Sequence, residues 1–349
     1  MCKQKVRRVP VAIVLASCSL FLFSAQLWAR IALPPWMADV RALSKKAPLV
    51  FRGYVLAVIP LSGNMEPGFG NQYMATIHVD RWYRGKGPAE ETLLFAYGSS
   101  ASNGHDCIDF RLVSNWIVFA QEDRGLLKLI DDCEGALAIS PLLGRDLGTS
   151  DWPTQMEADF LAGLNDPDPA ARLASIQRLG GLQLPSSRDA LHSVIEDGSD
   201  AEAKWAVYAA LRTGDISVLP RVRRLLANGD RELPESAIAS ELQSVTDPTA
   251  LPDLIAILQS APGESTRDSV LTALGENLKD PRAVPSLAAH LSDPGGRARY
   301  VSLVGLKNIT REEACTLAPD GKEADVEPQI SRCKIWWEQA GKFRDWSHN

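Results

Sequence analysis

The segment 235-ESAIASELQSVTDPTALPDLIAILQSA-261 contains two amphipathic stretches joined by a short turn, and it decides the fold of the C-terminal half. Each stretch carries apolar residues at the three- and four-residue spacing of a helix. The first stretch ends near a leucine that belongs to a series with spacings of 31 or 32 residues: Leu179, Leu211, Leu242, Leu274 and Leu306. A fixed period of this length predicts repeated pairs of helices.

The second stretch of three repeats begins with two apolar residues and a proline. These starts are Val218-Leu219-Pro220, Ala250-Leu251-Pro252 and Ala283-Val284-Pro285, and Ala190-Leu191 occupies the matching place in the first repeat. Proline suits the first turn of a helix, where an N–H would have no intrahelical partner. Asp-Pro pairs that begin at residues 168, 247, 280 and 293 predict aspartates at helix N-caps.

The first helix of each repeat is predicted over residues 170–181, 203–214, 235–246, 266–277 and 297–308. A single pair cannot bury its apolar stripes alone, so successive pairs must stack, and we predict an α-solenoid over residues 151–310. The period and the turns resemble HEAT repeats of the short bacterial type, including those of phycobilin lyases. The resemblance implies an armadillo-type scaffold for protein–protein contact.

The repeat stops after Thr310, and residues 311–349 are predicted to cap the solenoid. A solenoid needs a terminal element that covers its last apolar face. The segment from Trp336 to Trp346 is aromatic enough to do so. We therefore expect its tryptophans to pack against the last repeat rather than to bind a ligand.

The N-terminal half shows the two-residue alternation of strands instead. Strands are predicted over residues 49–59, 73–83, 92–97, 110–121 and 126–130. Five short strands separated by turn-rich segments predict a small β-barrel over residues 30–150. The fold class is therefore β plus α in separate domains.

Several strand motifs resemble the netrin-like OB barrel of the tissue inhibitors of metalloproteinases. They are 49-LVFRGYV-55, 75-ATIHV-79, 82-WYRG-85, 107-CIDF-110, 116-WIVFA-120 and the segment 126–133 that ends in a cysteine. The resemblance implies a five-stranded OB-like barrel. Inhibitors of this family place a free N-terminal cysteine on the protease zinc, whereas the mature chain here is expected to begin at Arg30. The resemblance therefore implies the scaffold without that inhibitory group.

The N-terminus has the form of an export signal. Four basic residues lie within the first eight positions, and Val9 to Ala29 carry no charge. We predict a signal peptide over residues 1–29, cleaved after Ala29, and hence a secreted or periplasmic protein. The alternatives are an uncleaved membrane anchor and a lipoprotein attached through Cys18.

Charge excludes one class of partner. The chain of 349 residues has 37 Lys and Arg against 43 Asp and Glu, a net charge of −6. Loss of the signal leaves 33 basic residues against 43 acidic ones, a net charge of −10. Sequence-independent binding to nucleic acid needs a strongly positive protein and is not expected.

Four cysteines remain after removal of the signal. We predict two local disulfides, Cys107 with Cys133 and Cys315 with Cys333, because exported proteins with even cysteine numbers usually pair them. The five histidines are scattered and no C-x-x-C motif occurs, so no metal is expected.

The sequence contains no motif of a known catalytic or cofactor site. Nucleophile elbows, Walker loops and Gly-rich dinucleotide turns are absent, and no histidine is followed by glutamate as in HEAT-type hydroxylases. Export also conflicts with the cytoplasmic role of a phycobilin lyase. We predict neither enzymatic activity nor a cofactor.

The candidate partner-binding residues are Arg221, Arg223, Arg224 and Asp253, on the second helices of two repeats. The three arginines form a local basic patch in an acidic protein and could receive an acidic partner. The alternative is a solvated helix face that keeps the protein soluble.

These observations predict an exported, non-catalytic HEAT-repeat scaffold that binds an unknown protein in the bacterial envelope or periplasm. One alternative is a protease inhibitor or regulator that acts through the open barrel edge and the loops around residues 60–72 and 98–106. The other is a membrane-tethered envelope protein with the same two domains.

Overall fold

The computed structural model describes residues 39–61, 71–97, 110–130, 135–149, 151–229, 233, 235–260, 263–317 and 326–347. The chain divides into two compact units, Met1–Arg178 and Leu179–Asn349. The predicted signal peptide, residues 1–29, lies outside the described residues.

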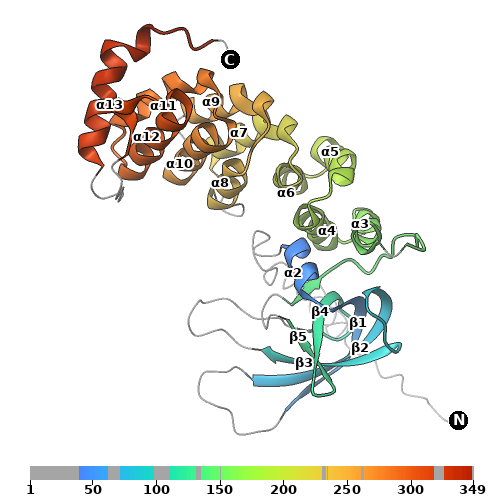
Figure 1. Ribbon diagram of the computed structural model, residues 1–349. Coiled ribbons are helices and arrows are strands. Elements are labelled where there is room, and N and C mark those ends of the chain that lie inside the picture. The colour runs from blue at the N-terminus through green and yellow to red at the C-terminus, as the bar shows by residue number, and fades with distance from the viewer. Residues whose placement is uncertain are drawn as a thin grey trace, which may run out of the picture. The chain divides into compact units, whose positions relative to one another are not determined.

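Five strands form the barrel of the first unit (Figure 1): β1 (Leu49–Pro60), β2 (Asn71–Arg84), β3 (Glu90–Tyr97), β4 (Asn115–Asp123) and β5 (Leu126–Leu129). Hydrogen-bonded neighbours follow the order β1-β2-β3-β5-β4, and β4 pairs back with β1 to close the barrel. The β3–β5 pairing is parallel and the others are antiparallel. This order confirms the predicted OB-like barrel.

Alternating side chains fill the barrel. On β2, Ala75, Ile77 and Val79 are buried in the core, whereas the intervening Thr76 and His78 are only partly buried. The two-residue period of the sequence therefore becomes an inside and an outside face.

The fourth strand begins later than predicted, at Asn115 rather than at residue 110. Residues 111–114 form a turn in which the Val113 N–H donates to the Val55 carbonyl at 2.9 Å. The Ser114 Oγ accepts a hydrogen bond from Trp116 Nε1 at 2.6 Å. Leu112 and Val113 are exposed at this turn, so their apolar character misled the strand prediction.

Two short elements of the first unit were not predicted. Helix α2 (Val40–Lys46) begins after Asp39, whose Oδ1 accepts the Ala42 N–H at 2.8 Å. Strand β6 (Ala136–Ala138) pairs with β4. Three and seven residues are too short to give a clear hydrophobic period.

The first unit also contains helix α3 (Trp152–Gly163), which contacts β2. Helix α4 (Pro169–Leu182) follows and continues into the second unit.

The second unit consists of helices arranged in successive pairs (Figure 1). They are α5 (Arg188–Asp197), α6 (Asp200–Arg212), α7 (Leu219–Asn228), α8 (Glu235–Gln243), α9 (Leu251–Gln259), α10 (Glu264–Thr272), α11 (Val284–Ala289), α12 (Gly296–Thr310) and α13 (Glu327–Gln339). Helix α10 contacts both α8 and α12, and α7 contacts α9, so equivalent helices stack along the unit. The predicted HEAT-like solenoid is confirmed.

The repeated residues take the places that the period predicts. Leu211, Leu242, Leu274 and Leu306 are all buried, as is Leu179 at the start of the unit. Pro220, Pro252 and Pro285 lie in the first turns of α7, α9 and α11. Burial of one leucine per repeat supplies the apolar contact that makes neighbouring pairs stack.

The Asp-Pro aspartates are caps at three of the four positions. Asp168, Asp247 and Asp280 accept N–H bonds from the second residue beyond each of them, at 2.9 to 3.0 Å. Asp293 accepts from Gly295 at 2.8 Å, but Gly295 is itself the N-cap of α12. The prediction was wrong there because Pro294 and two glycines lengthen the turn before the helix.

Two helices cross with almost no space between their backbones. A Cβ atom on Gly275 would lie 2.4 Å from the Gly305 Cα atom of α12. Gly275 lies in a π-helical turn, Ala273–Leu278, that continues α10. The predicted helix over 266–277 therefore changes its winding at the crossing, a feature that the leucine period does not reveal.

The C-terminal segment is tied by a disulfide between Cys315 and Cys333, as predicted, with 4.6 Å between their Cα atoms. Both cysteines are buried, and α13 contacts α12. The Arg344 guanidinium lies 5.6 Å from the ring centre of Trp336 and pairs with Glu312 at 2.6 Å. The other two predicted disulfide cysteines, Cys107 and Cys133, lie outside the described residues.

Candidate protein-binding site

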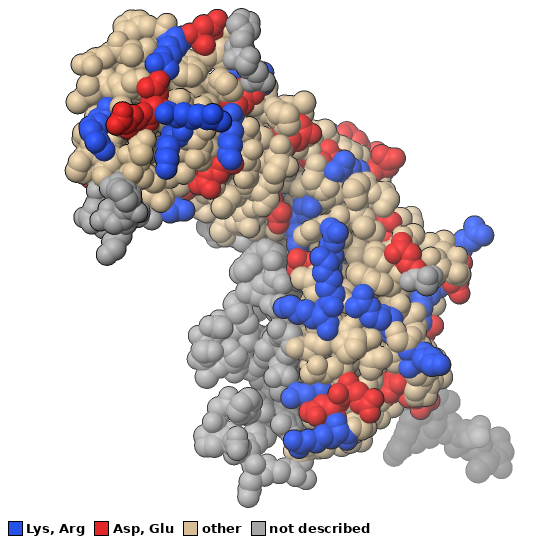
Figure 2. Space-filling model, viewed as in Figure 1, with Lys and Arg blue, Asp and Glu red and all other residues tan. Residues whose placement is uncertain are grey.

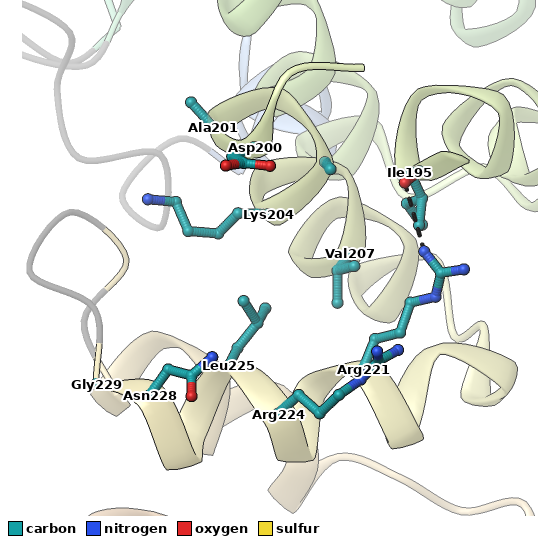
Figure 3. A pocket seen from close by; sticks show the side chains of 11 residues that line it. Ile195, Asp200, Ala201, Lys204, Val207, Arg221, Arg224, Leu225, Asn228 and Gly229 are labelled. Carbon is teal, nitrogen blue, oxygen red and sulfur yellow. Dashed lines mark hydrogen bonds between the residues drawn. The ribbon is translucent and has the colours of Figure 1, made fainter. Parts of the chain in front are cut away.

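A hollow of about 630 Å³ lies between α6 and α7, beside the end of α5 (Figure 3). We call it the α6–α7 hollow. Its apolar lining includes Ile195 on α5, Val207 on α6 and Leu225 on α7. Its volume is in the range of about 300–1,000 Å³ that is usual for ligand pockets.

Local sequence places one wall of the hollow on α6. Ser199 and Glu202 form a capping box, in which the Glu202 carboxylate accepts the Ser199 N–H at 3.0 Å. This cap starts the helix at Asp200. Asp200, Lys204 and Val207 then share one face because they are four and three residues apart.

The opposite wall belongs to α7. Pro220 lies in the first turn and is followed by Arg221, Arg224, Leu225 and Asn228, all of which line the hollow. Their spacing of three, one and three residues puts them on a single helix face. Figure 3 shows this face of α7 opposite Lys204 and Val207 of α6.

The edge of the hollow is basic. The Arg221 guanidinium forms an ion pair with Glu196 and donates to the Ile195 carbonyl at 3.4 Å, so its position is held by α5. Arg224 is exposed and has no ion-pair partner among the residues that the structure describes. Lys204 adds a third positive charge from α6.

The structure separates the four residues that the sequence analysis grouped together. Arg221 and Arg224 line the hollow, whereas Arg223 is exposed elsewhere on α7. Asp253 is partly buried on α9 and does not line the hollow.

The contribution of α6 was missed. Asp200, Lys204 and Val207 have the right spacing for one helix face, but the sequence does not tell that this face meets α7. The repeat period relates α7 to α9, the equivalent helix of the next repeat. It therefore does not indicate that α6 contributes to the same site. The spacing of Asp200, Lys204 and Val207 is the sequence signal that could have indicated a binding face on α6.

A second polar cluster has the composition of a catalytic triad but not its geometry. His192 Nε2 lies 2.7 Å from Asp215 Oδ2 and 3.4 Å from Ser217 Oγ. A triad needs one ring nitrogen on the carboxylate and the other on the nucleophile. Here one nitrogen faces both, and the Ser217 hydroxyl donates to Asp215 at 2.7 Å. The cluster therefore stabilises the turn before α7 and does not activate the serine.

Hydrogen bonding dominates the electrostatics of this turn. Burial by itself raises the pKa of the Asp215 carboxyl, but hydrogen bonds from Ser217 and His192 outweigh it and hold the pKa below its usual value.

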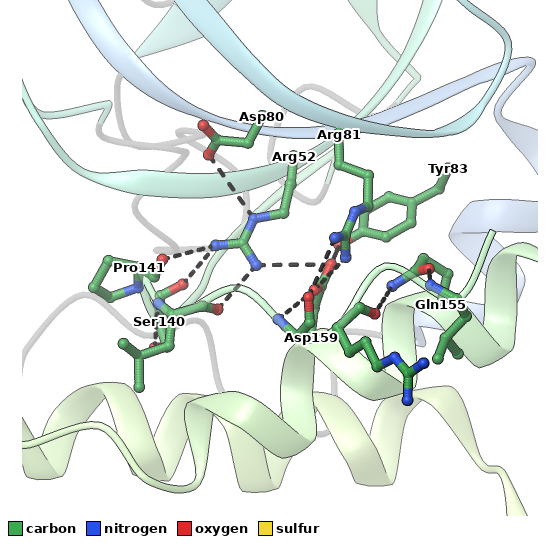
Figure 4. A network of polar contacts seen from close by, with 12 residues as sticks. Arg52, Asp80, Arg81, Tyr83, Ser140, Pro141, Gln155 and Asp159 are labelled. Atoms are coloured by element: carbon green, nitrogen blue, oxygen red, sulfur yellow. Dashed lines mark hydrogen bonds and ion pairs between the residues drawn. The ribbon is translucent and has the colours of Figure 1, made fainter.

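A buried network in the first unit joins the barrel to α3 (Figure 4). Arg52 donates to the carbonyls of Ser140 and Leu142, both at 3.1 Å. Its guanidinium also lies 3.7 Å from the Asp159 carboxylate of α3.

Asp159 accepts further hydrogen bonds from β2 and from the segment that precedes α3. Arg81 binds one of its oxygens at 2.5 Å, Tyr83 donates to the other, and the Gly144 N–H donates at 2.8 Å. Burial, together with the Asp159 charge, raises the pKa of Tyr83 well above its ordinary value. The Arg52 Nε has no hydrogen-bond partner among the described residues and lies 3.9 Å from the Asp80 carboxylate. The other contacts join the barrel to α3 and indicate a structural joint, which was not predicted from the sequence.

Of the two barrel loops predicted for protease inhibition, residues 62–70 of the loop around 60–72 and the whole of the loop 98–106 lie outside the described residues. In the part of the chain that the structure describes, no three His, Cys, Asp or Glu side chains form a cluster that could hold a metal ion. Across those same ranges, no helix has the length and hydropathy to cross a bilayer.

Comparison with known proteins agrees with the repeat pattern. A family model described as HEAT repeats matches residues 157–243. A chain from the complex of CpcE and CpcF of phycocyanin lyase, from Nostoc sp. PCC7120, is similar at 23% identity and a TM-score of 0.35. That similarity covers 51% of this chain and 70% of the other. No curated protein matches the chain. Residues 157–243 are thus HEAT repeats, and they follow a closed five-stranded OB-like barrel.

Proposed function

We propose that the protein is an exported, non-catalytic HEAT-repeat scaffold that binds a protein partner at the α6–α7 hollow. The observation that carries the proposal is the hollow itself, with apolar walls and a basic edge built on two helices. Helices fix the positions of their side chains more precisely than loops do, and a binding site needs such fixed positions. In this proposal residues 30–150 are the barrel domain, residues 151–310 the scaffold and residues 311–349 its cap.

Two features support export. The uncharged segment Val9 to Ala29 follows a basic N-terminus. The Cys315–Cys333 disulfide suits an oxidising compartment such as the periplasm. N-terminal sequencing of the protein from its own cells should give Arg30. A chain that starts at a lipidated Cys18, or one that keeps Met1, would contradict cleavage and favour a tethered protein.

A protein partner suits the surface better than a nucleic acid. The face in Figure 2 carries acidic and basic side chains side by side, and the whole chain has a net charge of −6. Binding to a nucleic acid backbone depends on many positive contacts.

Photo-crosslinking in the native cells tests the scaffold function. A photoreactive amino acid at Asn228 should yield a discrete adduct, because Asn228 lines the hollow. The same group at Arg223, an exposed position of α7 outside the lining, is the matched control. The adduct should disappear when Ala201→Trp fills the hollow. Equal adducts from both positions, or none from Asn228, would contradict the proposal.

A further inference from the structure

We infer that the α6–α7 hollow binds an acidic peptide segment that carries an apolar side chain between its carboxylates. This inference rests on the proposed scaffold function and names the chemistry of the partner. It depends on the apolar walls of the hollow, on its basic edge and on the different contacts of Arg221 and Arg224.

The walls select an apolar side chain. Ile195 and Val207 are buried residues that reach the hollow, and Leu225 is partly buried beside them. A side chain inserted here would cover apolar surface that water now contacts, which is favourable in proportion to the area covered. No aromatic ring is among the described lining residues, so a nucleic acid base would find no stacking partner.

The edge selects negative charge. Of the described lining residues, three are basic (Lys204, Arg221 and Arg224) and one is acidic (Asp200). Glu196, which pairs with Arg221, adds a second acid beside the hollow, so the basic groups still exceed the acidic ones by one. The whole chain has the opposite balance, with a net charge of −6. The hollow is therefore a local positive site on an acidic protein, and such a site attracts acidic segments and repels basic ones.

Two of the basic groups have different tasks. Glu196 and the Ile195 carbonyl hold the Arg221 guanidinium, so its remaining N–H groups are already oriented for a second acceptor. Arg224 is exposed and has no ion-pair partner within the described ranges, so a partner carboxylate need not displace an internal acid. Arg221 therefore orients the carboxylate of the partner, and Arg224 supplies a positive charge that no acidic group of the described ranges neutralises.

Fluorescence anisotropy with designed peptides tests the inference on the mature full-length protein. The probe is a fluorescein-labelled peptide with one leucine between glutamate pairs. Its two comparison peptides replace every glutamate by glutamine, or the leucine by alanine. We expect the acidic leucine peptide to bind most tightly, and each comparison peptide to bind at least about tenfold more weakly.

Two charge reversals on adjacent residues provide the decisive comparison. Arg224→Glu should weaken binding of the acidic peptide about tenfold or more, whereas Arg223→Glu, with the same charge change on the same helix, should change it less than about twofold. Both side chains are exposed, so thermal melting should be the same for both variants and the wild type. Ala201→Trp should abolish the advantage of leucine over alanine.

The outcomes separate the inference from the proposed function. Equal weakening by both reversals would show diffuse attraction and overturn the inference, as would equal binding of the glutamine peptide. If Asn228 still crosslinks a partner in that case, the scaffold function stands and only the acidic chemistry is wrong. If the peptides behave as expected but Asn228 yields no adduct, the hollow binds acidic segments and the scaffold function fails.

Discussion

Arg52 is a charged side chain in the interior of the barrel unit, with 1% of its surface exposed. Its position is tolerated because three carbonyl oxygens, of Ser140, Pro141 and Leu142, accept hydrogen bonds from its two terminal nitrogens and Asp159 lies close by. A buried charge without such partners would cost several kcal/mol. Arg52 therefore holds residues 140–142 and helix α3 against the barrel.

Arg52→Met should lower the free energy of unfolding by about 3 kcal/mol or more, because Asp159 and three carbonyls lose a buried donor. Urea denaturation measures the change. Arg124→Met makes the same chemical change at a side chain that is 94% exposed and should have almost no effect. Equal effects of the two substitutions would contradict the structural role of Arg52.

Asp215 should make stability depend on pH. Because its pKa is held below the usual value of 3.8 in the folded protein, its charge contributes stability above that value. This contribution is lost as pH falls through the lowered native pKa. Asp215→Asn keeps the cap acceptor but removes the charge, so we expect a cost of about 1 kcal/mol at neutral pH, because the hydrogen bonds to this buried side chain lose their charge assistance. The difference between the two proteins should shrink below pH 3.8, as measured by urea denaturation across the acid range. A constant difference would refute this role.

At the scale of elements, helix packing depends on the glycines where the extension of α10 crosses α12. A Cβ on Gly305 would lie 2.8 Å from the Gly275 Cα and 3.0 Å from a Leu287 methyl group. Backbone atoms cannot move aside as a flexible side chain can. The crossing therefore needs glycine at both positions.

Gly305→Ala should destabilise the second unit by about 1–3 kcal/mol through overpacking, although alanine favours helices over glycine by about 1 kcal/mol. Gly296→Ala, in the first turn of the same helix, is the control. Its Cβ would meet only the Arg299 guanidinium at 3.9 Å, so it should be neutral or slightly stabilising. Chemical denaturation of both variants measures the difference, and a stabilised Gly305→Ala protein would show that the helices can separate at little cost.

The elements that could be predicted are those whose signal lies within a few residues. Leu242 and its counterparts must be buried once per repeat, so their spacing alone indicates paired helices. The start of β4 could not be predicted because it depends on the Val113–Val55 backbone bond, which joins distant residues. The candidate site was predicted only in part for the same reason, because it combines residues from two helices. Arg221 and Arg224 were found from one helix, whereas Lys204 joins them only because α6 faces α7.

At the scale of the whole molecule, the first compact unit is larger than the barrel. It extends to Arg178 and includes α3, whose Asp159 is the common partner of Arg52, Arg81 and Tyr83. Removal of α3 would leave these three groups without a buried carboxylate. The barrel should therefore depend on the first helical segment for its own stability.

A fragment of residues 30–150 should be much less stable than one of residues 30–183. Loss of a buried charge partner costs about 3–5 kcal/mol, a large part of the roughly 5–15 kcal/mol that stabilises a typical domain. Circular dichroism during heating should show a cooperative transition in the longer fragment and a lower, broader one in the shorter. Asp159→Asn in the longer fragment should reproduce part of this loss. Identical transitions in all three would mean that the barrel is independent of α3.

The bond between Cys315 and Cys333 closes the segment between these two residues into a covalent ring. A protease that cuts the backbone once inside this ring cannot release α13, because the two pieces stay joined through sulfur. The nicked protein would migrate as an intact chain on a gel until a thiol is added. Damage to this segment in an oxidising compartment would therefore leave the last helix in place.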